Sequence, residues 1–388
     1  MAGAGAFGRN HLRVYRELET AGSGVALVAA VEPDPAHAAE AAEKYAIPVF
    51  SSVDDLLAAD LALDAASVAV PTVHHHAVAA TLLDAGLDLL VEKPLAASLA
   101  EADDLIARAD KRQRILQPGH LERFNPAVLA VQPQLRRPMF FEAHRLSVYT
   151  PRALDVDVVL DLMIHDLDIV LTFAASPVRE VRAVGLPIVS PKVDIANVRV
   201  EFDSGCVANF TASSVSTERV RKLRFFEPRQ YVSIDYARQD LLVIRIDDAE
   251  VGAAPDLQVA AAAAHFLATG KFDPALLAQL VASGKIDPSL IAQFAAGKIS
   301  PAQLAAAVQP QSAAALAPGL SFAKPPVTPG EPLRLEVLSF LDSVRTRREP
   351  RVTARQGRDA LELALEIQTT MAAHAQRAGL QDFFSPGA

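Results

Sequence analysis

Cysteine, surplus basic charge and long apolar runs are all scarce in this chain of 388 residues. The single Cys206 cannot form a disulfide within the chain, which is typical of a reducing cytoplasm. Acidic residues outnumber basic ones by 46 to 37, whereas nucleic-acid binding needs clustered Lys and Arg. Charges interrupt every apolar run well before the roughly 20 residues of a membrane span. These shortages argue against nucleic acid and membrane partners and predict a soluble cytoplasmic protein.

The length and the apolar patterns predict two domains. Residues 1–116 alternate short apolar runs with helical patterns, which is typical of a doubly wound parallel sheet, the Rossmann arrangement. Strands are expected at 25–31, 66–70 and 87–91, and helices at 35–45 and 76–85. Such a sheet binds its ligand at the carboxyl ends of its strands.

Residues 117–388 are predicted to form an α+β domain for substrate binding and oligomerisation, with an open, mostly antiparallel sheet. Its strands are expected at 139–148, 178–186, 196–202, 207–214, 221–226, 230–235 and 241–247, and a helix at 160–173. Helices at 333–347 and 354–377 are expected to fold back on the first domain.

An Ala- and Pro-rich insertion at about 253–326 separates the last strand from those helices. A short unit recurs in it at Gly270–Pro274, Gly284–Pro288 and Gly297–Pro301, each time before an apolar helical stretch. Gly ends one helix, Asp or Ser caps the next and Pro opens it. A surface appendage is the favoured interpretation, and a partner-docking site is the alternative.

A glycine-rich loop opens the chain. Gly3, Gly5 and Gly8, with Ala6 and Phe7 between them, have the spacing that lets backbone amides and a helix N-terminus approach a pyrophosphate. Glu32 ends the next expected strand, where a carboxylate accepts hydrogen bonds from a ribose diol and repels a ribose phosphate, so NAD is predicted over NADP. An ordinary solvated strand end is the alternative for Glu32.

The strand that should precede this loop is a difficulty. Only Met1 and Ala2 stand before Gly3, although the fold needs an apolar strand there. Either the true start lies upstream, which we favour because everything after the loop is intact, or the central strand is absent.

Glu92, Lys93 and Pro94 follow an apolar strand, which places Lys93 at the carboxyl edge beside the nicotinamide end of a cofactor. A lysine there can hydrogen-bond a substrate hydroxyl and stabilise charge as its proton leaves. The Lys93–Pro94 bond could be cis. A plain surface lysine is the alternative.

Asp161 and His165 share one face of an expected helix, with Asp168 one turn further. A histidine that titrates near neutrality can take an alcohol proton, and a carboxylate can orient it. A capped core histidine is the alternative. A metal site is not expected, because no further His or Cys stands at ligand spacing.

Three histidines, residues 74–76, follow Pro71 and Thr72 at the end of another expected strand. From this position Pro71, Thr72 and His75 could contact the cofactor. A loop of exposed imidazoles is the alternative.

Together these motifs resemble the Gfo/Idh/MocA oxidoreductase family in their order and separation. The resemblance implies a tightly held NAD or NADP, a homo-oligomer, and Lys93 and His165 as the catalytic pair supported by Asp161. It departs from the family at 156–160, which replace a glycine-rich segment. The cofactor residues it implies are Gly3, Gly5, Ala6, Phe7, Gly8, Glu32, Pro71, Thr72, His75, Glu92 and Lys93.

A narrower resemblance lies in residues 119–126 and 157–168. These are similar to the branch of the family that oxidises the 3-hydroxyl of UDP-N-acetylglucosamine, which would make Arg123 and Asn125 substrate contacts together with Lys93, Asp161 and His165. Oxidation of inositol, another free sugar or polyol, or a biliverdin-like ligand is the alternative activity. A nucleotide-binding sensor or scaffold without catalysis is the alternative of another class.

Overall fold

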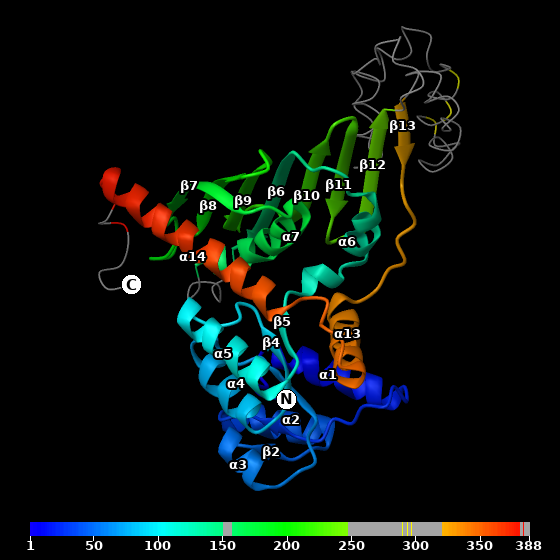
Figure 1. The fold of residues 1–388 in the computed structure, drawn as a ribbon, viewed down its shortest axis with the longest axis vertical. Coiled ribbons are helices and arrows are strands. Elements are labelled where there is room, and N and C mark those ends of the chain that lie inside the picture. The colour runs from blue at the N-terminus through cyan, green and yellow to red at the C-terminus, as the bar shows by residue number, and fades with distance from the viewer. Residues whose placement is uncertain are drawn as a thin grey trace.

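The computed structural model describes residues 1–149, 157–246 and 320–380, with the isolated residues 289, 293, 296 and 383. Two sheets with covering helices make up the described part (Figure 1). The insertion predicted at about 253–326 falls almost entirely outside the described residues.

The first sheet is parallel and belongs to the N-terminal third of the chain. Its strands are β1 (Ala30–Val31), β2 (Val49–Phe50), β3 (Ala65–Val68), β4 (Asp88–Glu92) and β5 (Leu116–Gly119). Strand β1 pairs with β2, and β4 pairs with β3 on one side and with β5 on the other. The helices are α1 (Gly8–Thr20), α2 (Pro35–Tyr45), α3 (Val53–Ala58), α4 (His75–Asp84) and α5 (Leu99–Arg112). The Rossmann prediction is therefore confirmed, although β1 spans two residues where 25–31 was expected.

Ala2 occupies the place of a central strand between β1 and β3. It bridges in parallel to Val31 on one side and to Val68 on the other. Its amide donates to Ser67 O at 2.8 Å, and its carbonyl accepts from Ala69 N at 2.8 Å. The two halves of the sheet are thus joined through the residue that directly precedes the glycine loop.

The second sheet has eight strands in the order β13-β12-β11-β10-β6-β9-β8-β7, antiparallel except for the β6–β9 pair. The strands are β6 (Phe140–Val148), β7 (Val178–Leu186), β8 (Ile195–Phe202), β9 (Val207–Ser216), β10 (Val220–Glu227), β11 (Gln230–Asp235), β12 (Asp240–Ile246) and β13 (Leu320–Ala323). This confirms the predicted open, mostly antiparallel sheet.

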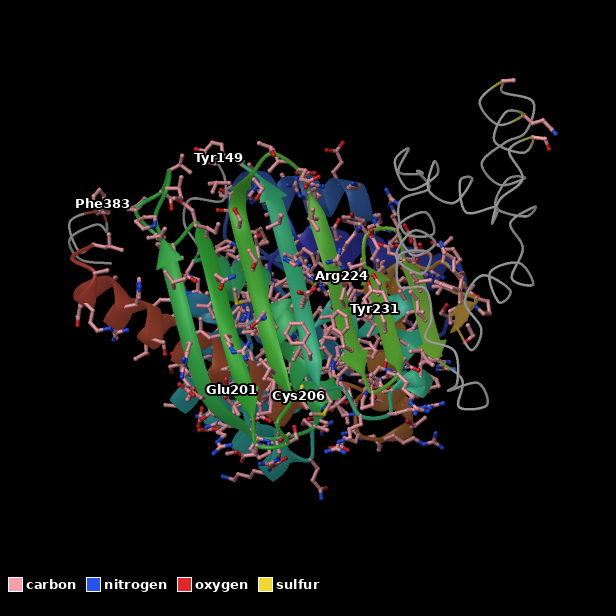
Figure 2. All side chains as sticks on the ribbon, turned by 90° about the horizontal axis from the view of Figure 1, so that it is seen from above. Tyr149, Glu201, Cys206, Arg224, Tyr231 and Phe383 are labelled. Atoms are coloured by element: carbon pink, nitrogen blue, oxygen red, sulfur yellow. The ribbon has the colours of Figure 1, made fainter. Side chains whose placement is uncertain are left out.

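The described helices cover one face of this sheet, and none of them lies on the other. A short π-helical turn (Val159–Met163) leads into α7 (Ile164–Ala174), and α7 and α14 (Ala354–Arg377) lie on the covered face together with α6 (Pro126–Val131). Short 3-10 turns stand at Thr72–His74, Leu121–Phe124 and Gln132–Gln134. Figure 2 looks onto the opposite face, on which Arg224 and Tyr231 lie.

The C-terminal segment returns to the first sheet. Helix α13 (Pro332–Thr346) packs Val337 and Phe340 into one apolar cluster with Leu12 of α1 and Leu90 of β4 (Figure 1). Beyond its end, Arg347 Nη2 lies 3.2 Å from Asp88 Oδ1. Helices predicted at 333–347 and 354–377 are observed, while the domain boundary at 116 stays a prediction. No helix in the described ranges is long and apolar enough to cross a membrane.

Candidate active site

The glycine loop is shaped by contacts that only glycine permits. Gly3 has φ +89°, and a Cβ on it would lie 2.7 Å from Ala69 O. A Cβ on Gly8, the first residue of α1, would lie 2.0 Å from Gly3 O, so strand, turn and helix pack backbone to backbone. A Cβ on Gly5 would meet nothing within 4 Å. Gly5 thus faces open space at the helix N-terminus, where a phosphate can approach the backbone.

Glu32 lies beside this loop. Its carboxylate accepts hydrogen bonds from Ala4 N at 2.7 Å and from Asp34 N at 3.0 Å, and the residue is buried. The alternative of a solvated strand end is therefore wrong. Each carboxylate oxygen has a second lone pair, so Glu32 can still accept from a ribose hydroxyl. The loop, the helix N-terminus and this acid fit a dinucleotide with an unphosphorylated ribose.

Lys93 stands at the carboxyl end of β4 and reaches across to the segment before α7. Its Nζ donates to Asp161 O at 2.7 Å and lies 3.3 Å from Asp161 Oδ1. The Lys93–Pro94 bond is cis. Within the described residues Asp161 therefore orients the lysine, whereas the sequence suggested that it would orient His165.

His165 lies one helical turn beyond Asp161, and its imidazole is held neutral. Burial lowers the pKa of His165 well below its ordinary value, and the positive charge of Lys93 lowers it further. Its Nδ1 is buried and has no hydrogen-bond partner in the part of the chain that the structure describes. A neutral imidazole with its proton on Nδ1 can accept a proton at Nε2. Two segments about 70 residues apart thus bring an ammonium group and a neutral imidazole to one place.

Pro71 and Thr72 lie at the same edge, because they follow β3 and the Ala69 backbone that Gly3 touches. His75 differs from its prediction. Its ring is buried, with Nδ1 2.8 Å from Pro94 O and Nε2 2.9 Å from Val70 O. Both the predicted cofactor contact and the alternative of an exposed imidazole are thus corrected: His75 ties together the loops that carry Thr72 and Lys93.

The other sequence candidates are buried and already paired. Glu92 Oε1 lies 2.8 Å from His11 Nε2, and Arg123 Nε lies 3.0 Å from Asp168 Oδ2. Asn125 donates to Glu122 Oε2 and to Tyr236 O, and its Oδ1 accepts from Ala127 N to cap α6. Since both amide hydrogens of Asn125 are used inside the protein, its predicted substrate contact is corrected to a structural role.

A buried ion cluster was missed by the sequence analysis. Arg145 of β6 donates from Nε and Nη2 to the two oxygens of Asp166, and from Nη1 to Glu122 Oε1 at 3.0 Å. Its guanidinium also stacks over the Tyr236 ring, 5.1 Å from the centroid. Burial opposes the charge, but Asp166 and Glu122 raise the pKa of Arg145 above its ordinary value. An inward-facing Arg on a strand of alternating pattern was the available signal.

Two further sequence predictions concern Cys206 and a metal site. Burial raises the pKa of the Cys206 thiol to about 11, as expected for a small core residue. Across the described ranges, no three His, Cys, Asp or Glu side chains stand close enough to hold a metal ion.

Family models and known proteins with similar sequences identify the class of this chain. Residues 1–120 match the model of the oxidoreductase family with an NAD-binding Rossmann fold, and residues 127–228 match the GFO/IDH/MocA C-terminal domain. The UDP-N-acetylglucosamine 3-dehydrogenase of Acidithiobacillus ferrooxidans is 38% identical over 240 residues, which is 62% of this chain and 74% of that one. The class is thus that of nicotinamide-dependent oxidoreductases, and the cofactor is NAD.

The chain belongs to the Gfo/Idh/MocA family. A crystal structure of the same Acidithiobacillus ferrooxidans enzyme matches with a TM-score of 0.74 and 29% identity, covering 96% of both chains. Inositol 2-dehydrogenase of Corynebacterium glutamicum is 30% identical over half of this chain and 57% of its own length. The resemblance drawn from the motifs is therefore confirmed.

Proposed function

We propose that this chain oxidises the 3-hydroxyl of UDP-N-acetylglucosamine to a 3-keto nucleotide sugar, with NAD as the hydride acceptor. The observation that carries the chemistry is the approach of Lys93 to Asp161 and His165, which come from two distant segments. The 38% identity to an enzyme named for this reaction supports the substrate.

The roles follow from the geometry of the side chains. His165 takes the hydroxyl proton at Nε2, because its depressed pKa keeps the ring neutral and ready to accept. Lys93 donates a hydrogen bond to the substrate oxygen and stabilises the charge that develops there, and Asp161 holds its ammonium in place. NAD supplies the acceptor for the hydride when it is bound. Arg123 is buried against Asp168, so we assign it the role of positioning that carboxylate.

We propose that the cofactor is bound by Gly3, Gly5, Ala6, Phe7, Gly8, Glu32, Pro71, Thr72, Glu92 and Lys93.

A matched pair of variants tests the glycine loop. Gly5→Ala has room in the protein, so we expect an unchanged melting temperature with NAD affinity reduced about tenfold or more. Gly8→Ala drives a Cβ into Gly3 O and should reduce both. Calorimetric titration with NAD, beside thermal melts, checks the pair; equal NAD affinity for Gly5→Ala and the wild type would contradict this placement.

The substrate is tested by incubating the purified protein with NAD and UDP-N-acetylglucosamine, with myo-inositol and free N-acetylglucosamine in parallel. We expect absorbance of reduced nicotinamide with the nucleotide sugar, and a product two mass units lighter. Turnover of inositol alone would favour the second candidate, which the inositol dehydrogenases among the relatives support. Tight NAD binding with no turnover of any polyol would favour a sensor without catalysis.

We further propose a cytoplasmic homo-oligomer, with residues 1–116 as the cofactor domain and 117–388 as the substrate and oligomerisation domain. The sheet face in Figure 2 supports this, because described helices cover only the opposite face. Light scattering of the purified protein gives the mass directly; a monomer of 41.3 kDa at micromolar concentration would contradict the assembly.

A further inference from the structure

A group of buried polar side chains short of hydrogen-bond partners lies behind Lys93 and His165. None of them is more than 4% exposed. The atoms without a partner among the described residues include the two side-chain amide atoms of Gln117, the two ring nitrogens of His120, Nη2 of Arg123 and the two carboxylate oxygens of Glu336. Buried polar atoms in folded proteins nearly always have a partner, so this concentration in one place requires an explanation.

The strand register puts Gln117 and Glu92 on one face of the first sheet. Gln117 pairs with Leu90, and Glu92 stands two residues further along the same strand face. Leu90 belongs to the same apolar cluster as Val337 of α13, and Glu336 directly precedes Val337. The negative charges of Glu92 and Asp168 add to burial in raising the pKa of Glu336 well above its ordinary value, so its carboxyl is neutral and these groups lie close together.

His120 connects this group to the reaction site. Its Nδ1 lies 3.9 Å from Asp168 Oδ2, and a Cβ on Gly357 of α14 would lie 3.7 Å from its Nε2. Burial lowers the pKa of His120, Asp168 and Glu92 oppose this, and Arg123 and Lys93 add to it. The charge of His120 in turn affects His165. His120 is therefore near both members of the proposed catalytic pair.

The distances favour bridging water. The 3.9 Å between His120 and Asp168 is too long for a direct hydrogen bond, and a buried water that joins such groups typically makes about three hydrogen bonds. His165 Nδ1 is a further buried donor without a protein partner in the described chain. We propose that Gln117, His120, Arg123, Asp168 and Glu336 hold a short chain of ordered water, through which His120 receives the Nδ1 proton of His165 as Nε2 takes the proton of the substrate.

The proton transfer balances, and it rests on the proposed function. The substrate O–H bond breaks and its proton binds His165 Nε2, while the carbinol C–H bond breaks and its electron pair leaves as hydride to NAD. The proton on His165 Nδ1 passes through water to His120, whose imidazolium is stabilised by Asp168. This proton returns from His120 to solvent when the product leaves. Glu336, neutral, donates a hydrogen bond to the water. His120 is thus a positioning and proton-accepting residue that acts through His165.

His120→Asn tests the proton step, with His374→Asn as the matched control. His374 also has a buried Nδ1 without a described partner, but it stands 17 residues along α14 from Gly357, about 25 Å away. For His120→Asn we expect kcat to fall about tenfold with KM unchanged, less than the 10²–10⁴ of a direct general base. The dependence of kcat on pH should also lose the step assigned to His120. His374→Asn should behave as the wild type; an unchanged kcat and pH profile in His120→Asn would overturn the proposal.

A crystal structure of the protein without substrate tests the water independently of turnover. We expect ordered waters within hydrogen-bond distance of His120 and Gln117. Glu336→Gln, which keeps a neutral hydrogen-bonding group, should retain them and the wild-type kcat. Glu336→Leu should lose them and reproduce the kinetic defect of His120→Asn. Full turnover without these waters would overturn this inference alone, whereas ordered waters in a protein that oxidises no sugar would contradict the proposed function and the proton step with it.

Discussion

The two sides of α7 carry polar clusters of opposite character. On one side Asp166 is bonded through both oxygens to Arg145, which also binds Glu122, so the buried charges are fully paired. On the other side the neighbouring residue His165 keeps Nδ1 unpaired, and its pKa is depressed by burial and by Lys93. Adjacent residues of one helix thus serve different ends: the paired cluster fixes the second sheet on the helix, and the unpaired one leaves groups free for chemistry. Perturbed titrating groups of the second kind are typical of active sites.

The largest expected effect lies on the paired side. Arg145→Met leaves Asp166 and Glu122 buried without their cation, so we expect the free energy of unfolding to fall by about 3–5 kcal/mol. Urea denaturation followed by circular dichroism measures it. Arg182→Met removes an exposed pair with Glu180 and should leave the denaturation midpoint unchanged. Equal midpoints for the Arg145 variant and the wild type would end the distinction between the two sides.

Lys93→Ala probes the reaction side and should affect catalysis while sparing the fold. Because it removes a charge aimed at the substrate oxygen, we expect kcat to fall by about 10²–10³. Thermal melts should show little change. Lys111→Ala, an exposed lysine of α5, is the control for loss of one positive charge. Full turnover by Lys93→Ala with any accepted sugar would remove the mechanism.

The depressed pKa of His165 predicts the pH dependence of the reaction. A general base must be neutral, and lowering its pKa extends the neutral form to more acidic solution. We therefore expect the acidic limb of kcat/KM to lie below pH 6.5. An initial-rate profile over pH 5–9 at constant ionic strength measures it, and a limb above pH 7 would show that His165 is not held neutral by its surroundings.

Glu336→Gln affects stability, and its effect depends on pH. A carboxyl whose folded pKa is raised destabilises the fold as pH rises above its unfolded pKa of about 4.5, until the folded pKa is passed. The Gln variant lacks this loss. Its advantage in the free energy of unfolding should grow as the pH rises above about 4.5, by up to about 1.4 kcal/mol per pH unit, until the folded pKa is passed. Parallel denaturation at several pH values tests it, and a constant difference would contradict a neutral Glu336.

Local pattern accounts for much of this fold and for part of the site. The helix at Pro35–Tyr45 begins with Asp34 capping His37 N and Pro at its first position, and both signals were visible in the chain. Strands β7 and β11 have the predicted bounds, and the side chains of β11 alternate between buried and half-buried positions. Glu336 had a readable signal as well, since it stands on the face of α13 that Leu333, Val337 and Phe340 make apolar.

The remaining features depend on contacts between distant segments. Neither the pairing of Asp161 with Lys93 nor the burial of His75 between Val70 O and Pro94 O has a local pattern, because each joins loops from different strands. The same holds for Asn125, whose amide is used by Tyr236 O, 111 residues further along the chain.

By itself the sequence determined the glycine loop, the acid after the next strand, the Lys93 and His165 motifs and the order of strands and helices, since these follow from spacing and periodicity within a few turns of chain. Only the tertiary structure decided which polar groups are paired with one another inside the protein and which stay available for a ligand. That division depends on burial and on partners brought together by the two sheets and by α13, and hydrogen bonding between buried groups has no counterpart in local sequence.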